Sequence, residues 1–415
     1  MARGLGRSYG DAAQCSGGTV VDMRSILGAS DVSGGEVEVG AGMSLDALLR
    51  RALPAGWFIP VTPGTRQVTV GGALAADIHG KNHHLDGSFA RHVSAITIAT
   101  PTGLRRVSAN EDAELFWATA GGMGLTGIVT SARVRMLRVE TDRMLVDTDR
   151  FSDLDAVMSA MEAGDARYRY SVAWVDCSGP AISTRQRAPG LRAGRAVLTR
   201  AVHARLEDLA PAERRPPAAP PRPALGTPRR VPRGLLNRLS IAAFNEAWYL
   251  RAPVHREAEV QSMWRFFHPL DGVADWNRLY GPRGFVQYQF VVPEKSGDVV
   301  AAVVRELSER RLPSFLAVLK RFGASSPGPL SFPMPGWTLA LDLPIGPQAL
   351  PTCLDRLDAM VAAAGGRVYL AKDSRLRPDL FSTMYPRLEE LSSVRQRVDP
   401  AGLMRSDLSR RLGLD

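Results

Sequence analysis

Two adjacent glycines interrupt an apolar stretch near the start of the chain, in PGTRQVTVGGALAADIHGKNHH (63–84). Residues 63–65 (Pro-Gly-Thr) are turn residues, and residues 68–70 (Val-Thr-Val) favour a strand. A backbone with glycine at positions 71 and 72 can approach a ligand closely and point its N–H groups into a concavity. The stretch therefore indicates either a pyrophosphate-binding loop or an ordinary tight turn.

The same region is rich in histidine, with His79, His83, His84 and His92 close together in sequence. No carboxylate or cysteine completes a familiar ligand set, and neighbouring Lys81 adds positive charge. We expect no metal site here.

A second glycine-rich stretch, GMGLTG (122–127), matches the G-x-G-x-x-G string. A dinucleotide fingerprint needs a strand before it and a helix after it. Here the helical pattern EDAELFWATAG (111–121) precedes and the strand-like IVTSARVRM (128–136) follows. The order excludes a Rossmann site, although some close approach of the backbone must still require these glycines.

Short β-like runs alternate with helical runs along most of the chain, which predicts an α+β protein. Strands are expected in GTVVDM, VEVGAG, VSAITIAT, GIVTSARVRM and GFVQYQFVVP, and strands or strand ends in FLAVLKRFG, WTLALDLPI and RVYLAKDSR. Helices are expected in SLDALLRRAL, which starts with a serine N-cap, and in EDAELFWATAG, SGDVVAAVVRELSERR and DPAGLMRSDLSRRLGL.

Residues 205–235 are rich in Pro, Arg and Ala and contain few large apolar side chains. Such a segment buries too little apolar surface to offset the entropy of ordering it. We interpret it as a flexible loop. Its arginines could attract phosphate or anionic lipid, or could be plainly solvated.

Composition is that of an ordinary globular protein, with 45% hydrophobic and 23% charged residues in 415. This length suggests two or three domains. The net charge of +10 is compatible with an anionic partner, or with solubility alone. Three widely spaced cysteines argue against a disulfide framework. The sequence shows no signal peptide and no apolar run of about 18 residues, so we expect a cytoplasmic or peripheral membrane protein, with a periplasmic location left open.

Four blocks in this order, RGLGRSYGDAA (3–13), PGTRQVTVGGALAADIHGKNHH, DAELFWATAGGMGLTGI (112–128) and RVYLAKDSR (367–375), resemble the vanillyl-alcohol-oxidase-type FAD flavoproteins. The likeness is greatest to the branch that oxidises polyprenylphosphoryl-ribose, and runs from Arg3 to Leu412. It implies a two-domain PCMH-type FAD-binding fold with a substrate domain on an antiparallel sheet. The expected FAD-binding domain is 1–143 with 367–415, lacking the first β-α-β part of the family domain, and the substrate domain is 144–366.

The resemblance implies FAD contacts at matching positions, without a covalent bond to His79. They are Gly4, Gly6, Arg7, Ser8, Tyr9 and Gly10 on the adenosine and pyrophosphate side; the N–H groups of Gly64, Thr69, Gly71 and Gly72 at the diphosphate; His79, Gly80, Lys81 and Asn82 at the isoalloxazine and ribityl region; Ile128 packing on the cofactor; and Tyr369 near the ring.

Lys372 is the leading catalytic candidate, because the resemblance places it opposite the flavin and a lysine of lowered pKa can act as a base. Period-2 alternation puts Gln287 and Gln289 on one strand face, where they could meet a sugar phosphate or face solvent. By resemblance both belong to the substrate pocket, with Trp248, Phe267, Lys320, Phe322, Thr338 and Ala340. The family carries a tyrosine where this chain has Phe267, an asparagine where it has Thr338 and a cysteine where it has Ala340. Thr338 and Ala340 share a strand face, so the changes cluster in the expected pocket.

The implied activity is FAD-dependent oxidation of the C2 hydroxyl of decaprenylphosphoryl-ribose to a 2-keto sugar. An NAD(P)H-dependent short-chain reductase would complete epimerisation to the arabinose donor of cell-wall arabinan. Alternatives are an alditol or sugar-lactone oxidase of the same fold, or a truncated non-catalytic partner protein. No nucleic-acid-binding motif is present.

Overall fold

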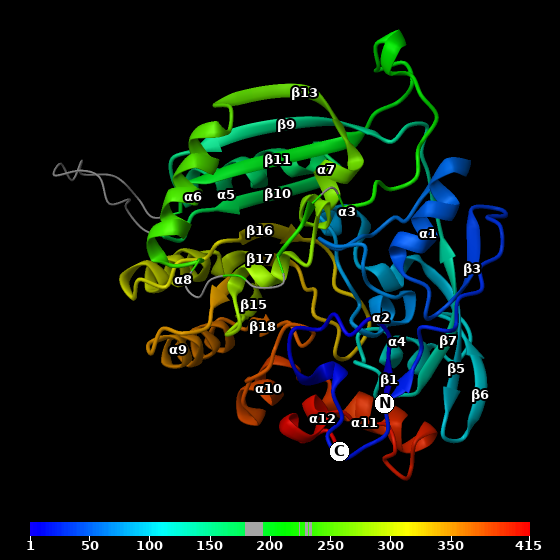
Figure 1. Cartoon of the computed structure of the whole chain (residues 1–415). Coiled ribbons are helices and arrows are strands. Elements are labelled where there is room, and N and C mark those ends of the chain that lie inside the picture. Colours follow the sequence, from blue (N-terminus) through cyan, green and yellow to red (C-terminus); the bar gives the residue numbers. More distant parts are fainter. Residues whose placement is uncertain (179–193, 224, 229–230, 232–234) are drawn as a thin grey trace.

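The computed structural model describes residues 1–178, 194–223, 225–228, 231 and 235–415. Two main sheets organise these residues (Figure 1). One has four strands in the order β3-β7-β5-β6, and the other has eight in the order β13-β9-β11-β10-β16-β17-β15-β18. The expected α+β class is confirmed. The expected division into two domains stays a prediction.

The smaller sheet and its helices occupy the first third of the chain. The elements are β1 (Ala2–Arg3), η1 (Asp11–Ala13), β2 (Val21–Asp22), β3 (Glu36–Gly40), α1 (Leu45–Ala52), η2 (Leu53–Ala55), β4 (Trp57–Phe58), α2 (Val70–Ala75), α3 (His83–Asp86), η3 (Phe89–His92), β5 (Val93–Thr100), β6 (Gly103–Val107), α4 (Ala113–Thr119), β7 (Ile128–Arg135) and β8 (Leu137–Arg138). Helix α1 starts as the sequence predicts, because Ser44 Oγ accepts a hydrogen bond from the N–H of Ala47.

The larger sheet is antiparallel and is built from the middle of the chain. The elements are β9 (Arg143–Phe151), α5 (Leu154–Gly164), η4 (Asp165–Arg167), β10 (Tyr170–Val175), β11 (Ala196–His203), η5 (Pro211–Glu213), β12 (Leu225–Gly226), α6 (Arg238–Arg251), β13 (His255–Ser262), α7 (Met263–Phe267), η6 (Pro269–Gly272), β14 (Val273–Ala274), η7 (Trp276–Tyr280), β15 (Phe285–Val292), η8 (Glu294–Ser296), α8 (Asp298–Glu309), β16 (Ala317–Phe322), β17 (Gly336–Pro344) and α9 (Leu350–Ala363). Strand β17 is buried along nearly its whole length and is a central strand, between β16 and β15.

The chain ends in a set of helices that return to its beginning (Figure 1). After β18 (Arg367–Val368) come α10 (Pro378–Met384), α11 (Leu388–Val398) and α12 (Asp407–Leu412). RVYLAKDSR was predicted as a strand or a strand end, and the structure shows a strand end, because β18 stops at Val368. The N–H groups of Lys372 and Asp373 both bond to the carbonyl of Tyr369, so the chain turns there and Lys372 lies on a tight turn.

The interpretation of residues 205–235 as a flexible loop did not anticipate the contacts that its described part makes. Arg50 of α1 and Arg66 donate to the carbonyls of Pro220 and Pro221, respectively. Strand β12 pairs with β14 in parallel. Proline lacks an N–H but keeps a good acceptor, so a proline-rich segment can be held by arginines without joining a large sheet.

Arg411 joins the two ends of the chain. Its guanidinium donates to both carboxylate oxygens of Asp11, to Asp373 and to the carbonyl of Leu376. Asp373 is almost fully buried, so removal of Arg411 leaves a buried carboxylate without its counter-charge.

We expect Arg411→Met to lower the free energy of unfolding by about 2–3 kcal/mol, because a buried charge loses its ion pair. Urea denaturation followed by circular dichroism measures this change. Arg377→Met is the control, since the Arg377–Asp379 pair is exposed and such pairs contribute roughly 0–1 kcal/mol. Equal effects of the two substitutions would contradict the assignment.

Candidate functional site

A large cavity of about 1040 Å³ lies between the two main sheets. Its volume is at the upper end of the range of about 300–1,000 Å³ that is typical of small-molecule and cofactor sites. Its walls come from the N-terminal loop (1–13), the segment 63–79, the glycine-rich 123–129, the strands β15, β16 and β17, and the turn at 369–372. Both glycine-rich stretches singled out in the sequence therefore meet at one cavity.

The N-terminal loop packs directly on two other walls because it carries glycine where side chains would collide. A Cβ atom on Gly4 would lie 2.2 Å from Oγ1 of Thr69, and one on Gly10 would lie 1.7 Å from the carbonyl oxygen of Asp373. Between them, the N–H of Tyr9 donates to the carbonyl of Ala371 at 3.0 Å. These contacts hold the loop against the turn that carries Lys372.

The backbone donors at the cavity divide into two groups. The N–H groups of Gly6, Arg7, Ser8 and Gly64 have no acceptor within the described ranges of the chain, and no described atom lies within 4 Å of a Cβ built on Gly64. Such donors can bind an anion.

Gly71 and Gly72 differ from the expectation that their N–H groups reach a diphosphate. The N–H of Gly71 donates to the carbonyl of Ala41 at 2.8 Å, and that of Gly72 donates to Oγ1 of its N-cap residue Thr69 at 3.2 Å. Helix α2 begins at this point and uses these donors. Both glycines still line the cavity, so their contribution is the absence of a side chain.

His79 lines the cavity and has a defined tautomer. Gln289 Nε2 lies 2.9 Å from Oγ1 of Thr338, which itself donates to the carbonyl of Phe290. An amide nitrogen only donates, so Gln289 Nε2 donates one hydrogen to Oγ1 of Thr338. It donates the other to Nε2 of His79, which lies 3.0 Å away. The proton of the neutral imidazole is therefore on Nδ1, a buried atom that has no partner among the described residues. Burial, with the charges of Lys320 and Lys372, lowers the pKa of His79 and keeps the ring neutral.

Three lysines lie near one another in this region. Burial lowers the pKa of Lys81 to about 7, and burial with the charges of Lys372 and Lys81 lowers the pKa of Lys320 to about 7. Burial lowers the pKa of Lys372 to about 8, and the charge of Asp342 partly opposes this shift. Groups poised near neutral pH in a cavity are typical of sites that transfer protons.

Asp342 is a site residue that the sequence analysis missed. It is buried, accepts a hydrogen bond from Nε2 of Gln287 at 2.5 Å, and lies 3.3 Å from the hydroxyl of Tyr280. Burial raises its pKa to about 6, against the hydrogen bond from Gln287 and the charge of Lys372. The signal was present in WTLALDLP, since Asp342 continues the alternation of Thr338 and Ala340 on one strand face.

Most of the predicted site residues meet at this cavity or on its immediate support. Those that line it are Gly4, Gly6, Arg7, Ser8, Tyr9, Gly64, Thr69, Gly71, Gly72, His79, Gln287, Lys320, Ala340, Tyr369 and Lys372. Phe322 supports His79 from behind, with ring centroids 4.8 Å apart. Ile128 lies on β7 between the lining residues Gly127 and Val129.

Three predicted positions lie in a neighbouring layer. Lys81 donates to the carbonyl of Phe266 and lies 4.0 Å from the centroid of that ring. Asn82 donates to the carbonyl of Pro60. Gly80 packs against Asn82 and Thr62. These three residues therefore pack behind the cavity wall and do not line the cavity.

Two predicted pocket residues are placed elsewhere. Trp248 is 47% exposed on α6, and Phe267 is buried among Phe58, Tyr170 and His203. Neither lines the cavity. The geometry therefore does not support the expectation that Trp248 and Phe267 form walls of the substrate pocket.

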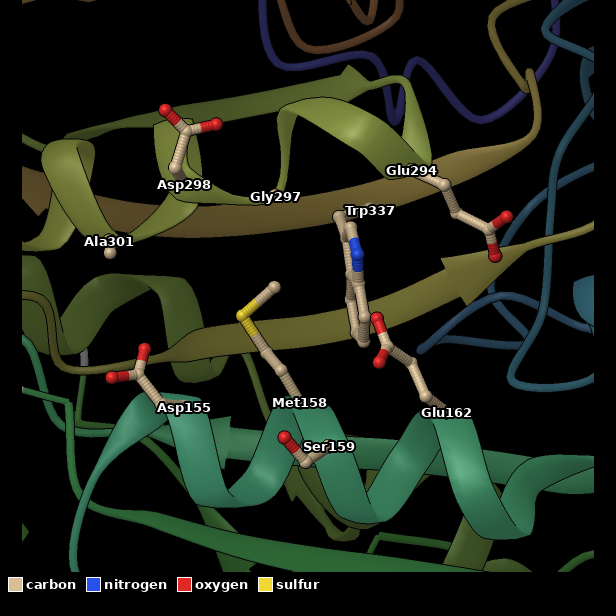
Figure 2. A pocket seen from close by; sticks show the side chains of 9 residues that line it. All are labelled: Asp155, Met158, Ser159, Glu162, Glu294, Gly297, Asp298, Ala301 and Trp337. Carbon is tan, nitrogen blue, oxygen red and sulfur yellow. The ribbon is translucent and has the colours of Figure 1, made fainter.

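A smaller pocket of about 360 Å³ lies between α5 and α8, next to Trp337 of β17 (Figure 2). Its acidic lining residues are Asp155, Glu162, Glu294 and Asp298. Carboxylates repel a phosphate, Glu294 is paired with Arg321, and neither glycine-rich stretch reaches this pocket. The large cavity is therefore the candidate site.

The histidines near the cavity bond to protein groups. The N–H of Gly323 donates to Nδ1 of His83 at 3.2 Å, while Nε2 of His84 lies near the carbonyls of Asp165 and Tyr168. Across the described ranges, no cluster of three or more His, Cys, Asp or Glu residues could hold a metal ion. In the same ranges, no helix is both long and apolar enough to cross a membrane.

Comparison with known proteins identifies the cofactor. Residues 1–108 match the FAD binding domain family. The chain is 44% identical to the decaprenylphosphoryl-β-D-ribose oxidase of Mycolicibacterium smegmatis over 420 residues, covering all of this chain and 89% of that protein. It is 40% identical to an uncharacterized protein of Streptomyces coelicolor over 382 residues, or 90% of this chain and all of that one. Cytokinin dehydrogenase 7 of rice is 29% identical over 180 residues, 40% of this chain and 34% of the enzyme.

The chain is thus an FAD-dependent oxidoreductase with a PCMH-type FAD-binding fold. The large cavity fits this cofactor on two observations. It offers backbone N–H groups at Gly6, Arg7, Ser8 and Gly64, which have no acceptor among the described residues, for a pyrophosphate. It also offers the buried N–H donor of His79, which is without a partner in the part of the chain that the structure describes, for a polar edge of a ring system.

We expect Gly10→Ala to weaken FAD binding on the order of tenfold or more, because the added methyl group collides with the carbonyl of Asp373 and displaces the loop. Titration of FAD into apoprotein, followed by flavin fluorescence, measures the dissociation constant. Gly28→Ala is the control, since no described atom lies within 4 Å of that Cβ position. Unchanged affinity in Gly10→Ala would show that the loop does not form the cofactor site.

Proposed function

Because this chain belongs to the family of the decaprenylphosphoryl-β-D-ribose oxidase of Mycolicibacterium smegmatis, we propose that it oxidises the C2 hydroxyl of a polyprenylphosphoryl-ribose to the 2-keto sugar. The observation that carries this proposal is the convergence of Lys372, Lys320, Gln287 and Asp342 on the cavity that the glycine-rich loops enclose. A secondary alcohol needs a group that takes the hydroxyl proton and groups that orient the ring. The cavity supplies both.

Lys372 is the proposed base. With its pKa lowered to about 8, the neutral amine is available near neutral pH and can accept the hydroxyl proton on Nζ. FAD, when bound, supplies the acceptor for the hydrogen and electron pair that leave the same carbon. The product is a ketone, and the proton remains on Lys372 until it is released to solvent.

Gln287 and Lys320 are proposed to orient the sugar. Gln287 Nε2 is engaged by Asp342, which leaves Oε1 without a partner in the described part of the chain. That oxygen can accept a hydrogen bond from a second hydroxyl, and a substrate without this hydroxyl would leave it unpaired at a cost of roughly 1–3 kcal/mol. Lys320 adds a donor from β16, which is separated from the strand of Gln287 by β17.

The proposed place of this reaction is the first half of an epimerisation. A ketone can be reduced from either face, so a separate NAD(P)H-dependent short-chain reductase acting on the opposite face would produce the arabinose configuration for cell-wall arabinan. Incubation with the purified oxidase alone should accumulate the 2-keto sugar, and addition of such a reductase should convert it to the arabinose product.

We expect kcat/KM of the parent to rise with pH and to level off above about pH 8, because the neutral form of Lys372 forms as pH passes its pKa of about 8. Lys372→Arg should lower kcat/KM on the order of 10²–10⁴-fold and abolish this rise, since arginine stays protonated throughout. Steady-state oxidation of the phosphosugar lipid from pH 6 to 10 measures both profiles. The absorbance of bound flavin serves as the control for cofactor retention.

A rise near pH 8 that persists in Lys372→Arg would exclude Lys372 as the base. Turnover of soluble alditols or sugar lactones, with none of the phosphosugar lipid, would replace the proposed substrate class.

Contact with a membrane surface is the remaining part of the proposal. Pro223, in the arginine-rich segment between Arg205 and the start of α6, lines the cavity, so this segment lies beside the route that a lipid substrate must use. Its arginines would attract anionic headgroups.

We expect deletion of residues 211–232 to weaken sedimentation with anionic vesicles and to slow turnover of the lipid substrate, because it removes basic residues beside the cavity. Vesicles of neutral lipid are the control, since they lack the attracting charge. Unchanged sedimentation together with unchanged turnover would contradict a role for the segment.

A further inference from the structure

Helix α6 presents an unusual number of exposed apolar side chains. Phe244 and Trp248 are 40% and 47% exposed, and Leu239 and Leu250 are 61% and 60% exposed. The helix is fixed to the body of the protein, because Asn245 is buried and donates to Asp176 and to the carbonyl of Ser314. Phe244 and Trp248 lie four residues apart and therefore on one side of α6, and an exposed aromatic pair on a fixed helix can serve as a binding surface.

Aromatic rings connect this helix to the cavity. Trp248 stacks on Phe244 with centroids 6.0 Å apart, and Phe244 lies 4.6 Å from Phe315. Phe315 lies 6.4 Å from Tyr280, whose ring stacks at 4.1 Å on Phe285. We call these five residues, Trp248, Phe244, Phe315, Tyr280 and Phe285, the aromatic track.

The inner end of the aromatic track is part of the cavity wall. Phe285 lines the cavity and lies 5.6 Å from the ring of Tyr9. Tyr9 in turn lies 6.0 Å from Nζ of Lys372. The track therefore runs from the proposed base to an exposed helix with no break larger than a ring–ring contact.

A cation lies where the track enters the cavity. The turn 281–284 joins Tyr280 to Phe285, and Arg283 in this turn lines the cavity. Its guanidinium makes no ion pair or hydrogen bond within the ranges that the structure describes. An arginine in this position can pair with a phosphate.

We infer that the aromatic track binds the isoprenoid tail of the lipid substrate, with the phosphate at Arg283 and the sugar at Lys372. This inference rests on the proposed function. The order of chemistry matches the order of groups in a polyprenylphosphoryl sugar: a polar cavity, Arg283 and the neighbouring Phe285 on its wall, then the exposed pair Phe244 and Trp248, with Phe315 and the buried Tyr280 between them. Aromatic faces suit the planar alkenes of an isoprenoid, and burial of each added CH₂ favours binding.

The test compares two substrates that share the phosphoribose head and differ in their tail, one a long polyprenyl chain and one a short isoprenyl chain. For the double variant Phe244→Ala, Trp248→Ala we expect KM for the long-chain substrate to rise on the order of tenfold or more. KM for the short-chain substrate and kcat for both should stay at parental values, because the catalytic groups are untouched.

Leu104→Ala is the matched control, since Leu104 is 70% exposed on β6 and lies outside the track. It should leave both KM values unchanged. The single variant Trp248→Gln, with its flavin content and melting temperature measured, covers the case in which the double variant folds poorly, and it should show a smaller rise of the same selectivity.

An equal rise for both tails, or no rise for the long tail, would overturn the inference while leaving the proposed function intact. So would a parental KM in detergent solution combined with lost vesicle sedimentation, which would assign the face to the bilayer itself. Parental protein that oxidises neither substrate would overturn the proposed function, and the inference with it.

Discussion

The close contact between the N-terminal loop and the turn at Lys372 is the constraint on which the site depends. At Gly10 the two backbones approach so closely that no side chain fits, and the adjacent hydrogen bond from Tyr9 to Ala371 fixes their register. Residues separated by some 360 positions in the chain thus form one wall. Arg411 reinforces the contact, because its guanidinium binds both Asp11, in the N-terminal loop, and Asp373, next to Lys372.

Burial of charge gives this enclosure its chemical character. Three lysines share a region with few counter-charges, so their pKa values fall toward neutrality. Asp342 is the counter-charge that acts on Lys372 from inside the cavity, and its own burial raises its pKa toward 6. Each group is therefore held close to the pH at which it exchanges a proton. The neutral His79, fixed by Gln289 and Thr338, adds a donor that does not titrate in the same range.

Sequence patterns predicted the regular elements well where local chemistry decides them. The serine cap of α1, the strand in GFVQYQFVVP and the reversed order of elements around GMGLTG were all confirmed. The patterns decided less where tertiary contacts compete with local preference. RVYLAKDSR left a strand or a strand end open, and its chain turns after Val368 to present Lys372. Gly71 and Gly72 look like free donors, yet the start of α2 and the carbonyl of Ala41 use their N–H groups.

Residue types and their short-range order were enough to predict the α+β class, the glycine-rich loops and the likeness to FAD flavoproteins. Only the tertiary structure showed that Asp342 faces Gln287, that Trp248 lies on an exposed helix away from the cavity, and that five aromatic rings join that helix to it. The reason is physical. A side chain's pKa and its partners depend on which distant segments pack around it, and no local pattern encodes that packing.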